Sequence, residues 1–126
     1  MKIAVGCDHG GLEHKNAIAE HLKSLKVANS IKNGENELGI LVCGTGIGMS
    51  LAANKVNGIR AAACSEHFSA KYTRLHNNSN ILCLGGRVIG IGTALELCDI
   101  FVNTEFEGGR HQRRIDMITE IEKSNS

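Results

Sequence analysis

The chain has 126 residues, of which 14 are Lys or Arg and 13 are Asp or Glu, so its formal net charge is only +1. This length suits one domain with a buried core, and the balanced charge excludes a general attraction to nucleic acid or to an anionic membrane. No apolar stretch approaches the roughly 20 residues that cross a bilayer. The five cysteines are an odd number, and no secretory signal opens the chain. We therefore expect a soluble, cytoplasmic protein without disulfides.

Four short apolar runs predict β-strands, at residues 2–7, 38–43, 60–64 and 80–84. The runs are apolar throughout instead of alternating, which is typical of parallel strands that are covered on both faces. Helices are predicted between and after them, at residues 12–26, 48–55, 69–75, 91–101 and about 111–123. This alternation predicts a three-layer α/β/α sandwich with a Rossmann-like parallel sheet, in a single domain over residues 1–126.

The first predicted helix contains a break in its apolar pattern at Lys26. Ile18 and Leu25 share one face of the helix. At about 100° per residue, however, Val27 and Ile31 lie roughly opposite Ile18, so the apolar stripe does not continue. The pattern indicates that two different helices have been joined at this point.

Two groups of polar residues follow predicted strands. Asp8 and His9 come after the first strand, and a glycine-rich loop, CGTGIG, begins at Cys43. Ligands of open parallel sheets bind at the carboxyl ends of the strands. The loop does not match the dinucleotide pattern G-x-G-x-x-G, because Met49 stands where the third glycine is needed, and it lacks the Lys-Ser/Thr ending of a phosphate loop. A nucleotide cofactor is therefore disfavoured.

The loop is suited instead to binding an anion or a developing oxyanion. It exposes successive backbone N–H groups before a helix, and Gly44, Gly46 and Gly48 allow a ligand to approach the backbone closely. The positive end of the helix would also favour the thiolate form of Cys43, as a base requires. The alternative is that Cys43 is a buried small hydrophobe. This is how we interpret the other four cysteines, Cys7, Cys64, Cys83 and Cys98.

The segment RLHNNSN contains His76 and Asn77 between a predicted helix and a predicted strand. Such a loop lies at the amino end of the sheet, opposite Asp8 and Cys43. A single loop histidine is more often a solvated side chain than a catalytic one. If His76 takes part in a site with Cys43, a neighbouring subunit must deliver it.

A second basic segment, EGGRHQRR at residues 107–114, places glycines before the last predicted helix. Arg110 and Arg114 are one turn apart and could hold a phosphate with forked donors. The alternative is a solvated basic helix start. Cations are unfavourable at a helix N-terminus, which favours an anionic partner. Arg87, which follows the strand at 80–84, is a weaker candidate of the same kind.

Four segments together resemble the ribose-5-phosphate isomerase B family, in the same order along the chain. They are GCDHGG (6–11), VCGTGIGMSLAANKVNGIRAAAC (42–64), RLHNNSNILCLGGRVIG (74–90) and NTEFEGGRHQRRID (103–116). The broader ribose/galactose isomerase family also contains galactose-6-phosphate isomerase subunits and enzymes that act on allose 6-phosphate.

The resemblance implies an aldose–ketose isomerase that interconverts ribose 5-phosphate and ribulose 5-phosphate through an enediolate, a reaction of the pentose phosphate pathway. His76 matches the family residue that opens the sugar ring, and Cys43 matches the base that moves the proton between carbons. The Thr45 hydroxyl would help to shuttle or stabilise charge. The oxyanion would rest on the amides of residues 44–48, that is Gly44, Thr45, Gly46, Ile47 and Gly48. No metal or redox cofactor is needed.

The same resemblance assigns the substrate contacts residue by residue. His9, Arg110 and Arg114 would hold the phosphate. Asp8 and Asn77 would bind sugar hydroxyls, and Arg87 matches a position that contacts ligand. Members of the family are dimers or tetramers with active sites shared between subunits, so the implied partners are a sugar phosphate and a second copy of the chain. The helix at about 111–123 is expected to pack at the oligomer interface.

The chain departs from the family in one place. Relatives carry a second strand and a loop with an Asp-Tyr-Pro motif after the first helix, whereas here Val27 follows Lys26 directly. The missing piece is roughly 20 residues or more. We interpret it as a segment left out of the sequence, which predicts a gap much larger than about 3.8 Å between these Cα atoms. A continuous helix would contradict this, and a true deletion predicts weak or absent activity.

Two alternatives stay open. The first is a hexose-6-phosphate isomerase that acts on allose 6-phosphate or forms a subunit of a galactose-6-phosphate enzyme. The second is a sugar-phosphate binding protein that has lost catalysis. The presence of both Cys43 and His76 argues against the second alternative, because a binding protein has no need of a base.

Overall fold

The elements alternate along the chain between strands and helices. The computed structural model describes residues 1–7 and 13–125, and for residues 13–22 it describes the backbone alone. The strands are β1 (Ile3–Cys7), β2 (Leu38–Cys43), β3 (Ala61–Ala63) and β4 (Ile81–Gly85). The helices are α1 (Glu13–Lys32), α2 (Ile47–Ala53), α3 (His67–Leu75), α4 (Ile91–Asn103) and α5 (Arg110–Ser124). Among the described residues, no helix is both long and apolar enough to cross a bilayer.

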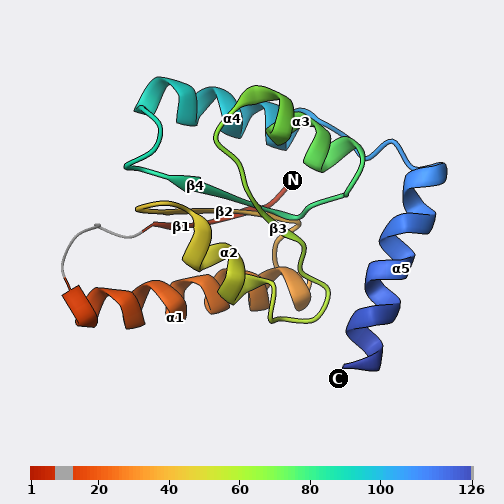
Figure 1. Ribbon diagram of the computed structural model, residues 1–126, viewed down its shortest axis with the longest axis horizontal. Coiled ribbons are helices and arrows are strands. Elements are labelled where there is room, and N and C mark those ends of the chain that lie inside the picture. The colour runs from red at the N-terminus through yellow and green to blue at the C-terminus, as the bar shows by residue number, and fades with distance from the viewer. Residues whose placement is uncertain (8–12, 126) are drawn as a thin grey trace.

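The four described strands form one parallel sheet in the order β1-β2-β4-β3. The two central strands, β2 and β4, are buried along almost their whole length. In their register Cys43 lies opposite Gly85, so both strands end at the same edge of the sheet. This edge carries the loops that lead from β2 into α2 and from β4 into α4 (Figure 1).

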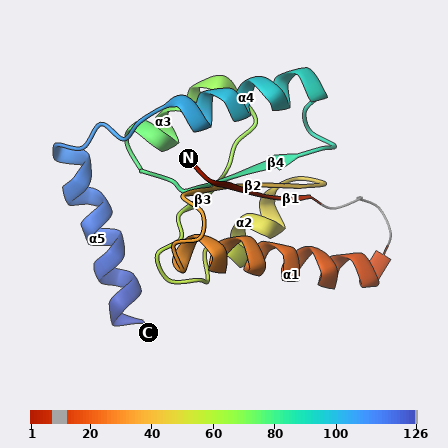
Figure 2. The ribbon, with the colours of Figure 1, turned by 180° about the vertical axis from the view of Figure 1, so that it is seen from behind.

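Helices cover the two faces of the sheet and produce the predicted three layers. Figure 1 shows α1 and α2 on one face and α3 and α4 on the other. Val27 of α1 and Met49 of α2 pack against Leu41 and Cys83, whereas Phe101 of α4 packs with the side chains of β2 and β4 that point the other way. α5 lies apart from these layers, beside the amino ends of the strands, as both ribbon views show (Figure 2). The predicted fold class is confirmed.

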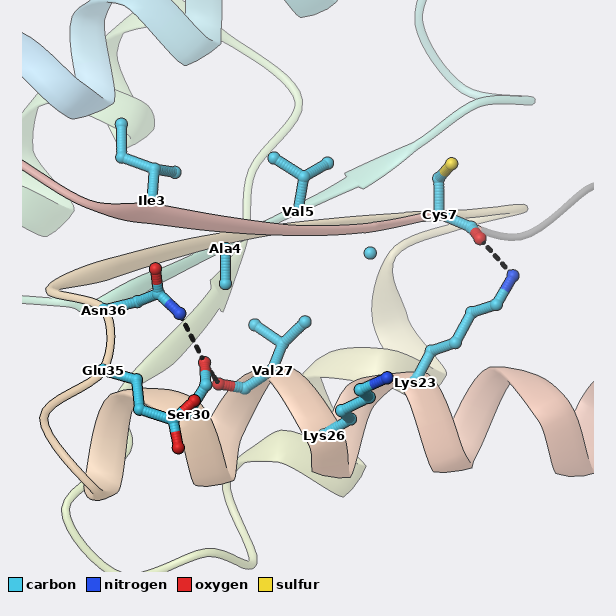
Figure 3. Close-up of a pocket in the computed structure, with 11 residues that line it drawn as sticks. Ile3, Ala4, Val5, Cys7, Lys23, Lys26, Val27, Ser30, Glu35 and Asn36 are labelled. Atoms are coloured by element: carbon cyan, nitrogen blue, oxygen red, sulfur yellow. Dashed lines mark hydrogen bonds between the residues drawn. The ribbon is translucent and has the colours of Figure 1, made fainter.

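The prediction that every strand is covered on both faces is wrong for β1. Val5 is 66% exposed and Ile3 is 36% exposed. β1 is an edge strand, and its side chains on the face away from α1 remain exposed (Figure 3). Cys7 shares this face and is exposed, so its interpretation as a buried hydrophobe is also wrong.

α1 runs without interruption through Lys26 and Val27 to Lys32. The structure shows no gap at this junction, so the interpretation of an omitted segment finds no support there. The change of apolar face is present, however, because Val27 is buried whereas Leu25 is 37% exposed. Ser24 lies on the buried face, where its hydroxyl donates to the Met49 carbonyl at 2.8 Å. α1 therefore packs on the sheet through the face that carries Ser24 and Val27, which differs from the predicted face that carries Leu25.

Candidate active site

The first cluster of candidate residues lies at the carboxyl edge of the sheet, around Cys43. This thiol ends β2 and is only 4% exposed. Its Sγ accepts a hydrogen bond from the Gly46 N–H at 3.0 Å. The Thr45 hydroxyl accepts a hydrogen bond from the Ile47 N–H at 3.2 Å, so its own proton remains available for donation. Two backbone N–H groups of the loop therefore donate hydrogen bonds, one to the Cys43 sulfur and one to the Thr45 hydroxyl oxygen.

The path of this loop is set by contact with β4. Gly46 has φ = 81°, and a Cβ there would lie 3.1 Å from the Leu84 backbone. A Cβ on Gly85 would lie 2.8 Å from the Thr45 backbone. Both positions therefore require glycine, one for its backbone conformation and both for space. α2 begins directly after this turn at Ile47, one residue before the predicted start.

Arg87 joins the same cluster. Its backbone N–H donates to the Gly44 carbonyl at 3.0 Å, and the Gly86 N–H donates to the Cys43 carbonyl at 2.7 Å. These two bonds tie the loop after β4 to the loop after β2. The Arg87 side chain lies over Gly44, where a Cβ would be 3.7 Å from its Cδ. Arg87 was a weaker candidate than Arg110 and Arg114, yet it is the arginine whose side chain lies against the loop that begins at Cys43.

The second cluster lies at the opposite edge of the sheet, around His76. This residue caps the C-terminus of α3. Its imidazole meets the Tyr72 ring edge-on with centroids 4.8 Å apart and stacks on the His111 ring at 3.9 Å. Its Nε2 lies 3.7 Å from a carboxylate oxygen of Glu107. Asn77 follows in the turn and is exposed.

The start of α5 supplies the rest of the second cluster. The Glu107 N–H donates to the Leu75 carbonyl at 3.0 Å, which fixes this segment to the end of α3. The first turn of α5 then presents Arg110 and Arg114, which line a shallow recess of about 340 Å³. His111 is 7% exposed, and its pKa is lowered by burial and then by the neighbouring His76. Both effects favour the neutral form of the His111 imidazole.

His76, Glu107 and His111 place potential metal-ligating atoms within 4.8 Å of one another. The two imidazole planes, however, are only 11° from parallel. Imidazole lone pairs lie in the ring plane, so the nitrogens of two stacked rings do not converge on a common ion. The arrangement fits a hydrogen-bonding and stacking cluster better than a metal centre.

The two clusters are separated by the length of the sheet. Cys43 lies at the carboxyl end of the central strands, and His76 precedes the amino end of β4. The five residues of β4 alone span roughly 16 Å. One small sugar phosphate cannot contact both clusters within a single chain. The predicted placement of His76 opposite Cys43 is confirmed, whereas Asp8 and His9 lie outside the described residues.

Glu107 and His111 were not among the predicted site residues. Both occur in the segment EGGRHQRR, where a histidine between arginines was the available signal. Their contact with His76 depends on how α5 docks beside α3, which local sequence patterns do not encode.

The fold is a three-layer α/β sandwich, and its two clusters hold a thiol, imidazoles and arginines, which are groups that can transfer protons and bind anions. The chain belongs to the Ribose/Galactose Isomerase family, whose sequence model matches residues 24–118. It is 42% identical to ribose-5-phosphate isomerase B of Escherichia coli (strain K12), over 97% of each chain. That alignment has 144 positions against 126 residues here, so at least 18 positions face a gap in this chain. This number agrees with the roughly 20 residues that the chain was predicted to lack relative to the family.

Solved structures of ribose-5-phosphate isomerase B are also similar to this chain. The ribose-5-phosphate isomerase B of Clostridium thermocellum is 44% identical, with a TM-score of 0.91 and complete coverage of both chains. The enzyme of Mycoplasma genitalium, solved with bound ribulose-5-phosphate, is 39% identical, with a TM-score of 0.81, and covers 96% of this chain and 95% of that one.

Proposed function

We propose that this chain is an aldose–ketose isomerase that interconverts ribose 5-phosphate and ribulose 5-phosphate. The observation that carries the proposal is the buried Cys43 thiol, whose sulfur accepts the Gly46 N–H at 3.0 Å. A backbone donor aimed at sulfur stabilises the thiolate, which is the form that can remove a proton. The two relatives named ribose-5-phosphate isomerase B support the choice of a pentose phosphate.

The reaction requires two proton-transfer groups. His76 exchanges a proton with the ring oxygen and the anomeric hydroxyl, which opens the cyclic sugar. Cys43, as the thiolate, takes the proton from the carbon beside the carbonyl and returns it to the neighbouring carbon. The enediolate oxygen that carries charge between these steps would face the amides of residues 44–48 and the Thr45 hydroxyl. Arg110 and Arg114 would hold the phosphate, and Asp8, His9, Asn77 and Arg87 the remaining polar groups.

The distance between the clusters requires the active site to be assembled from two chains. Cys43 of one copy would face His76, Arg110 and Arg114 of another copy. α5 also presents exposed apolar side chains, among them Met117 and Ile121, which suit burial against a second copy. We therefore infer a homo-oligomer with shared active sites, a dimer at least, and assign α5 to its interface.

A cytoplasmic location follows from the same proposal. None of the five cysteines forms a disulfide, as expected in a reducing compartment. A pentose phosphate isomerase belongs to the pentose phosphate pathway. Because at least 18 alignment positions are missing here, we expect turnover below that of the Escherichia coli relative.

Mixing two inactive variants tests the shared site. Cys43→Ala and His76→Ala are each expected to lose conversion of ribose 5-phosphate by about 10²- to 10⁴-fold. Subunits of the two variants, mixed and allowed to exchange, should regain about one quarter of wild-type turnover. Half of the dimers are then mixed, and each mixed dimer has one intact site of two. No gain on mixing would contradict the shared site.

A cysteine control tests the base. Cys98→Ala changes a half-buried thiol on α4, away from the loop, and should keep turnover within about twofold. Unchanged turnover in Cys43→Ala would exclude Cys43 as the base. A parent that binds ribulose 5-phosphate without turning it over would favour a binding protein, and faster turnover of allose 6-phosphate would favour a hexose-phosphate isomerase.

A further inference from the structure

Arg74 lies two residues before His76, in the last turn of α3, and is half-buried. Its Nη1 donates to the Asn78 Oδ1 at 2.9 Å and to the Ser79 carbonyl at 2.6 Å. Its Nε donates to the Thr104 carbonyl at 3.1 Å. This one side chain therefore joins the end of α3 to two other segments, the turn that follows the helix and the end of α4.

The bonds to the turn hold an unusual backbone conformation. Asn78 has φ = 47°, in the left-handed region that is uncommon for residues other than glycine. Its side-chain oxygen is bound by Arg74, and its carbonyl accepts the Arg60 Nε–H at 3.1 Å. His76 and Asn77 lie between α3 and this anchored residue. The bonds to Asn78 thus fix the backbone that carries both candidate site residues.

The bond to Thr104 holds the other side of the His76 cluster. Thr104 is the C-cap of α4, and three residues later the chain reaches Glu107. The Glu107 N–H donates to the Leu75 carbonyl at 3.0 Å, and its carboxylate lies 3.7 Å from the His76 Nε2. Arg74 therefore anchors both segments that surround the His76 imidazole.

The geometry of the guanidinium suits this double contact. The group is planar and holds its Nε and Nη1 donors in a fixed fork. Here the fork binds the turn and the end of α4 at once, and its Cζ lies 5.7 Å from the centroid of the Phe101 ring. A lysine offers one ammonium on a flexible chain, so it cannot reproduce both contacts in the same orientation.

The partners of Arg74 lie at the amino edge of the sheet, whereas the Cys43 loop lies at the carboxyl edge. We propose that Arg74 is a positioning residue for ring opening, and that it acts by holding the His76 imidazole in place. The inference rests on the proposed function, in which His76 opens the sugar ring and Cys43 moves the proton between carbons. Loss of Arg74 should then impair the first step and spare the second.

The two steps can be measured separately because only one of the two sugars is cyclic. Ribose 5-phosphate closes a ring through its C4 hydroxyl, whereas ribulose 5-phosphate has its carbonyl at C2 and its C5 oxygen esterified, so it stays open. In D₂O the Cys43 thiolate removes a C1 proton from ribulose 5-phosphate and forms the enediolate. The thiol then exchanges its proton with solvent, and a deuteron returns to C1. This exchange needs the base but not ring opening.

Arg74→Ala should lower kcat for ribose 5-phosphate by about 10- to 100-fold, as a shift near 1 Å in a catalytic group does. Its C1 exchange, measured by NMR at saturating ribulose 5-phosphate, should stay within about threefold of wild type, because Cys43 is distant. Arg74→Lys should show the same split with a smaller loss, and far-UV circular dichroism checks that both variants fold.

His67→Ala is the matched control for the docking of α3 on α4. It removes another polar link between these helices, the 2.7 Å contact of His67 with Glu96, at the far end of α3. Both reactions should stay within about twofold of wild type in this variant.

A double variant tests whether Arg74 acts through His76. His76→Ala alone should lose conversion and keep exchange, and adding Arg74→Ala should lower conversion no further, since residues that act as a unit are not additive. Equal losses of both reactions in the Arg74 variants, no loss in Arg74→Ala, or a further loss of about tenfold in the double variant would overturn the inference. A wild-type chain that neither converts ribose 5-phosphate nor exchanges ribulose 5-phosphate would instead refute the proposed function, before any variant is compared.

Discussion

The two edges of the sheet are built in different ways. At the carboxyl edge, the loop around Cys43 is held by backbone contacts: Gly46 packs on β4, and the Gly86 N–H binds the Cys43 carbonyl at 2.7 Å. At the amino edge, His76 is held by ring contacts with Tyr72 and His111, which come from α3 and α5. The difference indicates that strand register fixes the proposed base, Cys43, whereas the docking of α5 fixes the groups proposed for ring opening and for phosphate binding. Changes at the first edge should therefore damage the fold and activity together, and changes at the second edge should separate them.

The largest effect is expected from Gly46→Ala at the carboxyl edge. The new Cβ would lie 3.1 Å from the β4 backbone in a left-handed conformation, so the loop must shift. We expect a loss of about 2–5 kcal/mol in the free energy of unfolding, measured by urea denaturation. A shift near 1 Å at Cys43 should also lower turnover about 100-fold.

Gly34→Ala is the matched control for this prediction. Gly34 has φ = 80°, close to the 81° of Gly46, but a Cβ there has open space around it. This variant should lose about 1–2 kcal/mol and keep its turnover. Equal losses in both variants would show that backbone strain alone, and not packing on β4, determines the loop.

A smaller effect is expected from Arg114→Ala at the amino edge. Arg114 is exposed, so the free energy of unfolding should change by less than about 0.5 kcal/mol. Loss of a charge-assisted bond to phosphate should raise KM for ribose 5-phosphate by about 10- to 100-fold. Arg113→Ala is the control, since Arg113 lies in the same recess but off the i, i+4 face of Arg110 and Arg114. A similar rise in KM for both variants would exclude a specific phosphate contact.

The smallest effect concerns the pH dependence of stability at His111. Its pKa is lowered by burial, then by His76, and further by Arg110 and Arg114, while Glu107 acts in the opposite direction. The unfolded chain therefore binds this proton more readily, and stability is lost as pH falls from the unfolded value of about 6.5 toward the lower folded value. His111→Asn should show a smaller fall in Tm between pH 7.5 and 5.5. An identical fall in both proteins would contradict the assignment.

The carboxyl edge could be predicted from sequence because its features are local. The run LGILVC predicted a buried strand at residues 38–43, and β2 has these same bounds. Strand order and the parallel ladder then place Cys43 and Arg87 together. The opposite position of His76 also followed from chain order alone, since a helix-to-strand loop lies at the amino end of a parallel sheet.

The features that sequence did not predict depend on contacts between distant segments. The apolar run of β1 predicted a strand that is covered on both faces, and no local pattern showed that Val5 would remain exposed. The stacking of His76 on His111 joins residues 35 positions apart and depends on the docking of α5. At Lys26 the pattern detected the change of helix face, yet it could not show that one continuous α1 would carry both faces.

The different environments of the cysteines make covalent labelling informative. Burial raises the pKa of Cys64 to about 11 and, with a contribution from Cys43 and Cys64, raises that of Cys83 to about 12. Both thiols are therefore protonated and poorly nucleophilic at neutral pH. Cys7, by contrast, lies exposed on β1. Brief alkylation followed by mass spectrometry should thus modify Cys7 first, and the rate of that modification reports directly on whether the edge of the sheet is occupied.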